Sequence, residues 1–169
     1  PGHPPHNDPA PASPLLPRFL ERHPDEEARL YAGAVDVLVT LQSAPPPPGL
    51  PNLSIEEWAE AAMLALDHYA AGVLGRAPDG AALRRALAAA LSRHGDGPKV
   101  MIHRDYFAGN LMVLDRPGCA GIGVVDFQLG QLGQQVYDLV SLLQDARRDL
   151  LPGLEAKMKA RFAGAMGLG

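Results

Sequence analysis

Prolines are crowded into one end of this sequence, where thirteen of the seventeen fall within the first 51 residues. Proline has no amide hydrogen to donate, and it biases the residue before it away from the helical region. The opening PGHPPHNDPAPASPLLP therefore predicts an irregular segment over residues 1–17, and Pro45–Pro48 predicts a second break. The folded unit is expected over residues 18–169. His3 and His6 have no accompanying carboxylate or thiol cluster, so we expect them to be solvated rather than metal ligands.

The composition indicates one folded domain, because 47% of the 169 residues are hydrophobic and 20% are charged. The net charge of −4, with no run of basic residues, excludes the usual electrostatic footprint of a nucleic-acid binder. A single cysteine, Cys119, cannot form an internal disulfide, which favours a reducing compartment. No apolar run approaches the ~20 residues that span a bilayer. We expect a cytoplasmic protein with no nucleic-acid partner and no membrane partner.

Two helices are predicted on either side of the Pro45–Pro48 break. Apolar residues recur every three or four positions over residues 25–43, as one face of a helix requires. Ser54-Ile55-Glu56-Glu57 has the form of a capping box and starts a second helix that ends near Gly75. His68 and Tyr69 lie on this helix and are interpreted as structural rather than as ligand contacts. The packing stripe of the second helix is predicted to be Ile55, Trp58, Ala62, Ala65, Tyr69 and Val73.

A third helix, short strands and two further helices complete the predicted layout. Asp79 is the expected cap of an alanine-rich helix that runs to about His94 and lies on the outside. Beyond it, KVMI, NLMVL and GIGVVDF are short apolar segments separated by polar loops and turns, which indicates β structure. Helical spacing returns over residues 136–146 and again from Pro152 to about Phe162. The sequence therefore predicts an α+β fold that is mainly helical, with a small β hairpin.

The residues with chemical potential lie in the β region. HRDYFAGN at residues 103–110 reads H-R-D-x-x-x-x-N, and a D-F dipeptide follows at Asp126 after the predicted hairpin. Phosphoryl transfer from ATP requires a carboxylate beside the attacking hydroxyl, and carboxylate and amide oxygens that hold Mg²⁺. We therefore interpret Asp105 as the catalytic base and Asn110 and Asp126 as the Mg²⁺ ligands. The joint pattern is far more specific than an H-R-D tripeptide alone.

Four neighbouring residues are candidates for supporting roles. His103 and Arg104 open the loop, and we expect His103 to hold it by hydrogen bonds rather than to do chemistry. Gln128 either lines the phosphate or substrate side of the site or is simply exposed. Asp138 either suits the N-terminal end of the next helix or braces the catalytic loop from below.

With these motifs in place, residues 20–162 resemble the aminoglycoside phosphotransferase family of protein-kinase-like small-molecule kinases. HRDYFAGNLMVL, GVVDFQ and YDLVSLLQDARRDL look most like the branch that phosphorylates the cell-wall amino sugars N-acetylmuramate and N-acetylglucosamine. The resemblance implies Asp105 as base, Asn110 and Asp126 as Mg²⁺ ligands and Asp138 as support for the loop. It also implies that the chain is the helical C-terminal lobe of the fold, with ATP as co-substrate.

Two departures from the family pattern bear on function. The family has a Gly-rich phosphate loop and a strand lysine in a preceding lobe, and this chain shows neither, since its lysines are Lys99, Lys157 and Lys159. We therefore expect the N-terminal nucleotide lobe of the same protein to be absent here, and the fragment to be inactive alone. Leu129 stands where the amino-sugar branch often has an acidic residue.

The expected function is an ATP- and Mg²⁺-dependent phosphotransferase acting on a hydroxyl of a small molecule, with an amino sugar as the expected acceptor. Arg104 stands where aminoglycoside kinases usually have glycine, and the segment after Asp138 mixes acidic and basic residues, so a polycationic antibiotic fits less well. The alternatives are a catalytically inactive kinase-like binding module, or a kinase of the same family for an aminoglycoside, choline or an amino acid.

Overall fold

The computed structural model describes residues 14–76, 78–94 and 97–168, and it is an α+β fold as predicted. The predicted irregular residues 1–13, with His3 and His6, lie outside the described residues. Seven α-helices are described: α1 (Leu16–Leu20), α2 (Glu27–Ser43), α3 (Ile55–Leu64), α4 (Ala71–Leu74), α5 (Ala81–His94), α6 (Tyr137–Leu143) and α7 (Leu154–Met166). Four strands are described: β1 (Lys99–Ile102), β2 (Leu111–Val113), β3 (Ile122–Val124) and β4 (Gln131–Gln134).

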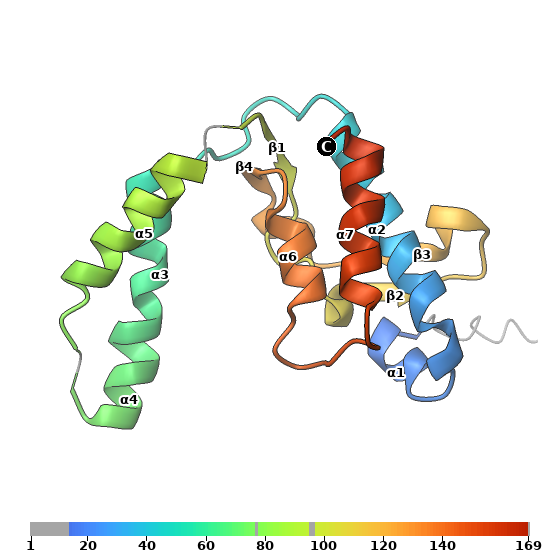
Figure 1. The fold of residues 1–169 in the computed structure, drawn as a ribbon, viewed down its shortest axis with the longest axis horizontal. Helices are drawn as coiled ribbons and strands as arrows, with labels where there is room; N and C mark the ends of the chain where they lie inside the picture. The colour runs from blue at the N-terminus through green and yellow to red at the C-terminus, as the bar shows by residue number, and fades with distance from the viewer. Residues whose placement is uncertain (1–13, 77, 95–96, 169) are drawn as a thin grey trace, which may run out of the picture.

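The hydrophobic core forms where α2 and α7 lie side by side (Figure 1). Leu30, Ala34 and Leu38 repeat every four residues, so they share one face of α2, and all three are buried. Met158 and Phe162 of α7 have the same spacing and enter the same cluster. This core supports the β segments that carry the predicted site.

The strands form two antiparallel pairs. β2 and β3 make the predicted hairpin, with Leu111 opposite Val124 and Val113 opposite Ile122. β1 pairs instead with β4, so that Lys99 lies opposite Gln134 and Ile102 opposite Gln131. The sequence analysis did not predict β4, because its QLGQ sequence is polar and contains glycine.

Helices α3, α4 and α5 form a helical hairpin that stands apart from the core, on the left of Figure 1. The predicted capping box is confirmed: the Ser54 amide donates to Glu57 Oε2 at 2.7 Å, and the Glu57 amide donates to Ser54 Oγ at 3.2 Å. Asp79 Oδ1 accepts from the Ala81 amide at 2.9 Å, which confirms the cap of α5. Between α3 and α4 the helix widens into a π-helical segment, Ala65–Ala70.

The structure corrects three expectations. Residues 16 and 17 were expected to be irregular, but they begin α1, because a proline in the first helical turn lacks only an amide that would be unpaired there anyway. Ala62, Ala65, Tyr69 and Val73 were predicted to pack, but they are exposed; α5 covers a face one residue away, where Ala59 and Met63 are buried. The helix predicted over 136–146 ends at Leu143.

Within the part of the chain that the structure describes, no helix combines the length and the apolar character needed to cross a membrane. His68 and Tyr69 are both exposed on the helical hairpin. They contribute surface rather than core.

Candidate active site

The HRDYFAGN loop, residues 103–110, runs from the end of β1 to the start of β2. Tyr106 anchors its centre, because the side chain is fully buried and its hydroxyl donates to the Ala34 carbonyl of α2 at 2.9 Å. Burial also raises the pKa of the Tyr106 phenol, so the hydroxyl stays protonated and available as a donor. The loop is thereby fixed to the longest helix of the core.

Asp138 holds the first part of this loop from inside the protein. Its carboxylate is fully buried at the start of α6 and accepts hydrogen bonds from the amides of His103, at 2.6 Å, and Arg104, at 2.9 Å. Burial raises the pKa of the Asp138 carboxyl, against the opposing effect of these two amides. Asp138 therefore lies in the first turn of α6 and also bonds to the catalytic loop, so both interpretations of this residue fit its position.

His103 ties the catalytic loop to the segment that follows β3. Its buried ring lies with Nε2 at 3.0 Å from the Val125 carbonyl, which can only accept, so Nε2 carries the proton. Nδ1 is buried and has no hydrogen-bond partner among the described residues. The Val125 amide in turn donates to the Asn110 carbonyl at 3.1 Å. His103 thus links the two loops by a direct hydrogen bond, which is the contact that its expected holding role requires.

Asp105 and Asn110 are brought together across the turn of the loop. Asn110 Nδ2 donates both to Asp105 Oδ2 and to the Asp105 carbonyl, each at 3.0 Å. Asn110 is buried while Asp105 is partly exposed, so the side-chain amide of Asn110 positions the Asp105 carboxylate, which solvent can reach. These bonds use the nitrogen of the Asn110 side chain and leave its Oδ1 for another partner.

Asp126 follows Val125 directly and lies on the exposed side of the site. Its backbone is left-handed, with φ 67° and ψ 39°, a conformation that Asp tolerates better than most residues. Gln128 Nε2 donates to Asp126 Oδ1 at 2.9 Å. The carbonyl and the amide of Val125 both form hydrogen bonds with the catalytic loop. Because Asp126 is the next residue, these bonds hold it beside that loop.

Arg104 connects the catalytic loop to the helical hairpin. Its backbone is also left-handed, with φ 75°, and its guanidinium carbon lies 5.7 Å from the centroid of the Trp58 ring on α3. Trp58 packs against Tyr137 with ring centroids 5.1 Å apart. Burial raises the pKa of the Tyr137 phenol. Arg104 directly precedes Asp105, and Tyr137 directly precedes Asp138, so the contacts of Trp58 reach both ends of the catalytic loop's support.

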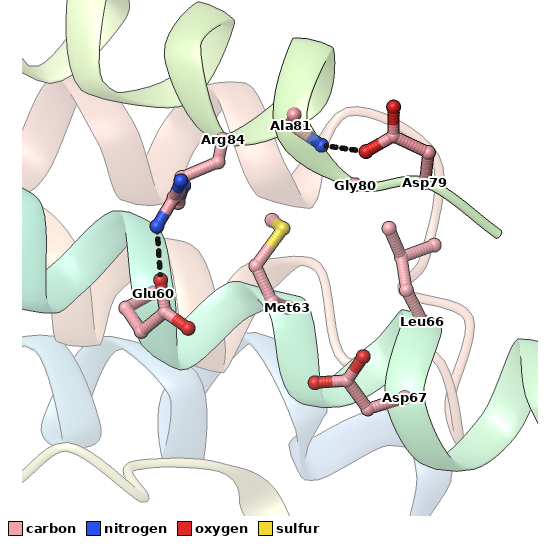
Figure 2. A pocket seen from close by; sticks show the side chains of 8 residues that line it. All are labelled: Glu60, Met63, Leu66, Asp67, Asp79, Gly80, Ala81 and Arg84. Carbon is pink, nitrogen blue, oxygen red and sulfur yellow. Dashed lines mark hydrogen bonds and ion pairs between the residues drawn. The ribbon is translucent and has the colours of Figure 1, made fainter. Parts of the chain in front are cut away.

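A cavity of about 210 Å³ lies between α3 and the start of α5 (Figure 2). Glu60 and Arg84 form an ion pair across it at 3.0 Å, and Met63 and Leu66 supply its apolar wall. None of its lining residues comes from the catalytic loop or from the Asp126 loop. It is a surface cavity of the helical hairpin, lined in part by exposed charged side chains.

The structure therefore unites the predicted residues Asp105, Asn110, His103, Arg104 and Asp138 in one bonded network, and Asp126 joins it through Val125. Gln128 is exposed but oriented by Asp126. The sequence analysis missed Tyr106, although a large aromatic inside a polar loop is a signal of an anchor. It also missed the contact of Trp58 with Arg104, for which a single sequence holds no signal.

A loop of this design, with a held carboxylate and a neighbouring Asp-Phe segment, has the positioning features that phosphotransferases use. The sequence profile of the phosphotransferase enzyme family matches residues 10–167, and the chain belongs to this family. The resemblance seen in the motifs is confirmed.

Three curated relatives have the same name, N-acetylmuramate/N-acetylglucosamine kinase. The protein from Caulobacter vibrioides is 34% identical over 163 residues, which cover 89% of this chain and 45% of the relative. The protein from Pseudomonas aeruginosa is 33% identical over 127 residues, which cover 73% of this chain and 36% of the relative. The protein from Neisseria meningitidis is 52% identical over 50 residues, which cover 29% of this chain and 14% of the relative. The chain thus spans less than half the length of the relatives it matches.

Proposed function

We propose that the complete protein is an ATP- and Mg²⁺-dependent kinase that transfers a phosphoryl group to a hydroxyl of an amino sugar. The observation that carries this proposal is the clamp of Asp105 by Asn110 beside a segment, Val125-Asp126, that is bonded to the same loop. Phosphoryl transfer depends on such positioning more than on covalent chemistry by the protein. The names of the relatives support an amino sugar as the acceptor.

Asp105 is the proposed catalytic base. Its carboxylate is partly exposed, so an acceptor hydroxyl can approach, and the bond from Asn110 Nδ2 fixes the orientation of Oδ2. The carboxylate orients the hydroxyl and accepts its proton as the oxygen attacks the phosphorus. Tyr106 and Asp138 keep the loop backbone in place during this step.

Asp126 and Asn110 are the proposed Mg²⁺ ligands. The described residues hold no cluster of three or more His, Cys, Asp or Glu side chains that would form a closed metal cage. The donor set fits Mg²⁺ nevertheless, because this ion is usually bound through one or two carboxylates together with water and substrate phosphates. When bound, the ion neutralises charge on the transferred phosphoryl group. Asn110 Oδ1 and the Asp126 carboxylate would hold it, while Gln128 Nε2 donates a hydrogen bond to Asp126 Oδ1.

His103, Arg104 and Asp138 are proposed to support the site without touching the reacting atoms. His103 sets the spacing of the two loops through Val125, and Asp138 satisfies the amides of His103 and Arg104. A nucleotide lobe of the same protein, outside this chain, is proposed to contact the ATP phosphates. In support, the relatives are more than twice as long as their matched portions.

A coupled ATP-consumption assay on the complete protein tests the proposal. N-acetylmuramate, N-acetylglucosamine, kanamycin and choline are compared, each with and without Mg²⁺. We expect metal-dependent turnover of an amino sugar. Silence with all four acceptors but intact Mg²⁺·ATP binding would mean a kinase of another acceptor, and silence without nucleotide binding would favour a non-catalytic binding module.

The metal assignment has its own test, the substitution Asp126→Ala. Because Asp126 is exposed and supplies a proposed ligand, we expect weaker binding of Mg²⁺·ATP with no loss of fold. Isothermal titration of the nucleotide with and without Mg²⁺ measures the effect. Unchanged affinity for Mg²⁺·ATP would contradict the metal role.

A further inference from the structure

The contacts of Trp58 close a ring around the residue that precedes Asp105. The centroid of the Trp58 ring lies 5.7 Å from the Arg104 guanidinium carbon and 5.1 Å from the centroid of the Tyr137 ring. Tyr137 is followed by Asp138, whose Oδ1 accepts from the Arg104 amide at 2.9 Å. Trp58 belongs to the helical hairpin, whereas the other three residues belong to the catalytic loop and α6. The Trp58 side chain therefore links the hairpin to the residue before the proposed base.

The Arg104 guanidinium lies against both aromatic side chains. Its distance to Trp58 is within the range of an attractive cation–π contact. Burial raises the pKa of the Tyr137 phenol, while the charge of Arg104 and a side-chain hydrogen bond from it act in the opposite direction, so the guanidinium and the phenol are neighbours. Within the described ranges, no carboxylate lies at ion-pair distance from Arg104. Its side chain is thus available to the aromatic pair.

The backbone of Arg104 lies between two points at which the loop is held. Asp138 accepts from the Arg104 amide, and Asn110 Nδ2 donates to the carbonyl and to Oδ2 of Asp105. Between these points the chain turns with φ 75° at Arg104, a conformation that residues other than glycine adopt at a steric cost. Such a conformation persists only where the surrounding contacts determine it. A contact that holds the Arg104 side chain therefore also holds the turn that leads into Asp105.

We propose that Trp58 is a positioning residue: through Arg104 it fixes the turn that directs the Asp105 carboxylate, so that the helical hairpin raises kcat without contacting the acceptor. This inference rests on the proposed function, in which Asp105 is the base. Phosphoryl transfer depends on the placement of the attacking hydroxyl, and a displacement of about 1 Å can lower the rate by roughly 100-fold. Neither Trp58 nor Arg104 has to touch a reacting atom to produce such an effect.

The first test measures kcat and KM separately for the amino sugar and for Mg²⁺·ATP in the complete protein. Trp58→Leu removes the ring that contacts Arg104, so we expect kcat to fall roughly 10- to 100-fold while both KM values stay within about 3-fold. Trp58→Phe keeps an aromatic face and should recover part of the loss. Tyr69→Leu is the matched control, because Tyr69 is an aromatic residue of the same hairpin that is 76% exposed. It should keep full activity.

A double-mutant cycle tests the route through Arg104. Arg104→Gln removes the cation and should lower kcat to a similar extent, whereas Arg104→Lys keeps a cation and should retain more activity. Because Trp58 and Arg104 act through one contact, the double variant should lose no more than the larger of the two single losses. Arg29→Gln is the matched control for the charge, since Arg29 is 63% exposed and pairs with Glu26.

Tryptophan emission gives a readout that needs no turnover, because Trp58 is the single tryptophan of these 169 residues. We expect the emission of Arg104→Gln to differ from that of the unsubstituted protein, and the emission of Arg29→Gln to match it. Equal emission in all three proteins would overturn the contact on which the inference depends.

The kinetic outcomes separate this inference from the proposed function. Unchanged kcat in a folded variant, additive losses in the cycle, or a raised KM for the acceptor at unchanged kcat would overturn the positioning role and leave the kinase function intact. Turnover of no amino sugar by the unsubstituted protein would overturn both together. A non-additive loss confined to kcat supports the inference. If circular dichroism shows that Trp58→Leu does not fold, the Arg104 variants decide, since they leave the sequence of the hairpin unchanged.

Discussion

The core and the helical hairpin of this molecule are built on different amounts of buried surface. The main hydrophobic cluster draws on α1, α2, the β2–β3 hairpin, α6 and α7, and none of its buried members lies between residues 44 and 98. In the helical hairpin, α3 and α5 pack on each other, and the buried hydrophobic residues there are Ala59 and Met63, as far as the structure describes it. Leu64, Tyr69, Val73 and Leu74 are exposed.

This difference separates a well-packed core, which anchors the catalytic loop, from a helical hairpin with few buried residues. The catalytic loop is anchored to the core through Tyr106 and Asp138. The helical hairpin reaches that loop through the Arg104–Trp58 contact and the tilted ring contact between Trp58 and Tyr137. Regions with few buried contacts open at lower free energy than a packed core.

The largest expected effect is on activity, at Asp105. This residue lies on the loop that the core anchors, but it contributes little to the packing of the core. Asp105→Asn removes the proposed base and should lower kcat by roughly 10²- to 10⁴-fold, while the melting temperature stays nearly unchanged. Steady-state kinetics and thermal unfolding of the complete protein measure both. Asp149→Asn, at an exposed carboxylate after α6, is the control and should keep full activity. Full activity of Asp105→Asn would refute the base assignment.

The next effect is on global stability. Phe162 is 1% exposed in the core, so Phe162→Ala should lower the free energy of unfolding by about 3–5 kcal/mol. Denaturant unfolding followed by circular dichroism measures it. A loss below about 1 kcal/mol, typical of a surface site, would mean that α7 does not share the core of α2.

A smaller and more local effect is expected in the helical hairpin. Met63 is 6% exposed but lines the cavity between α3 and α5, so Met63→Ala should cost about 2 kcal/mol, near the low end for such a truncation. Hydrogen exchange should accelerate in peptides from residues 55–94 and not in α2 or α7. Equal acceleration in all helices would show that the two regions unfold as one unit.

The smallest expected effect is an opposite response of the two regions to pH. Hydrogen bonds from the backbone and then the side chain of Ser54 lower the pKa of Glu57, so the stability that this group lends α3 is present above its unfolded pKa and is lost as pH falls through the lowered value. Burial raises the pKa of Asp138, so the folded core binds its proton more tightly, and stability falls as pH rises through the raised value. Local stability, measured by hydrogen exchange at a series of acidic pH values, should therefore rise with pH in α3 and fall with pH around the catalytic loop.

Two variants assign these slopes to their groups. Glu57→Gln should flatten the dependence in α3, and Asp138→Asn should flatten it around the catalytic loop. Slopes of the same sign in both regions of the unsubstituted protein would contradict the assignment.

Local signals in the sequence were sufficient for much of the fold and for the contact between Asp105 and Asn110. The capping box at Ser54, the cap at Asp79 and the β2–β3 hairpin are all decided by residues close together in the chain, and each is observed. Asp105 and Asn110 are five residues apart, so their contact follows from one loop.

Features decided by distant parts of the chain were not predictable in this way. β4 exists because β1 lies beside it, and its own sequence has little strand character. The buried face of α3 depends on the position of α5, and the alanine-rich sequence offers too little apolar contrast to choose between adjacent faces. The hydrogen bond of Tyr106 to Ala34 and the cation–π contact of Arg104 with Trp58 join segments that only the folded chain brings together.

The left-handed backbone at Arg104 has a consequence for how this site can change over generations. Many arginine and glycine codons differ by a single nucleotide, and glycine adopts a positive φ without the steric cost of a Cβ. One mutational step can therefore exchange Arg104 for glycine while the turn beside Asp105 keeps its shape. The same step removes the guanidinium that contacts Trp58. A single-nucleotide change can therefore remove, and a reverse change restore, this contact between the helical hairpin and the catalytic loop.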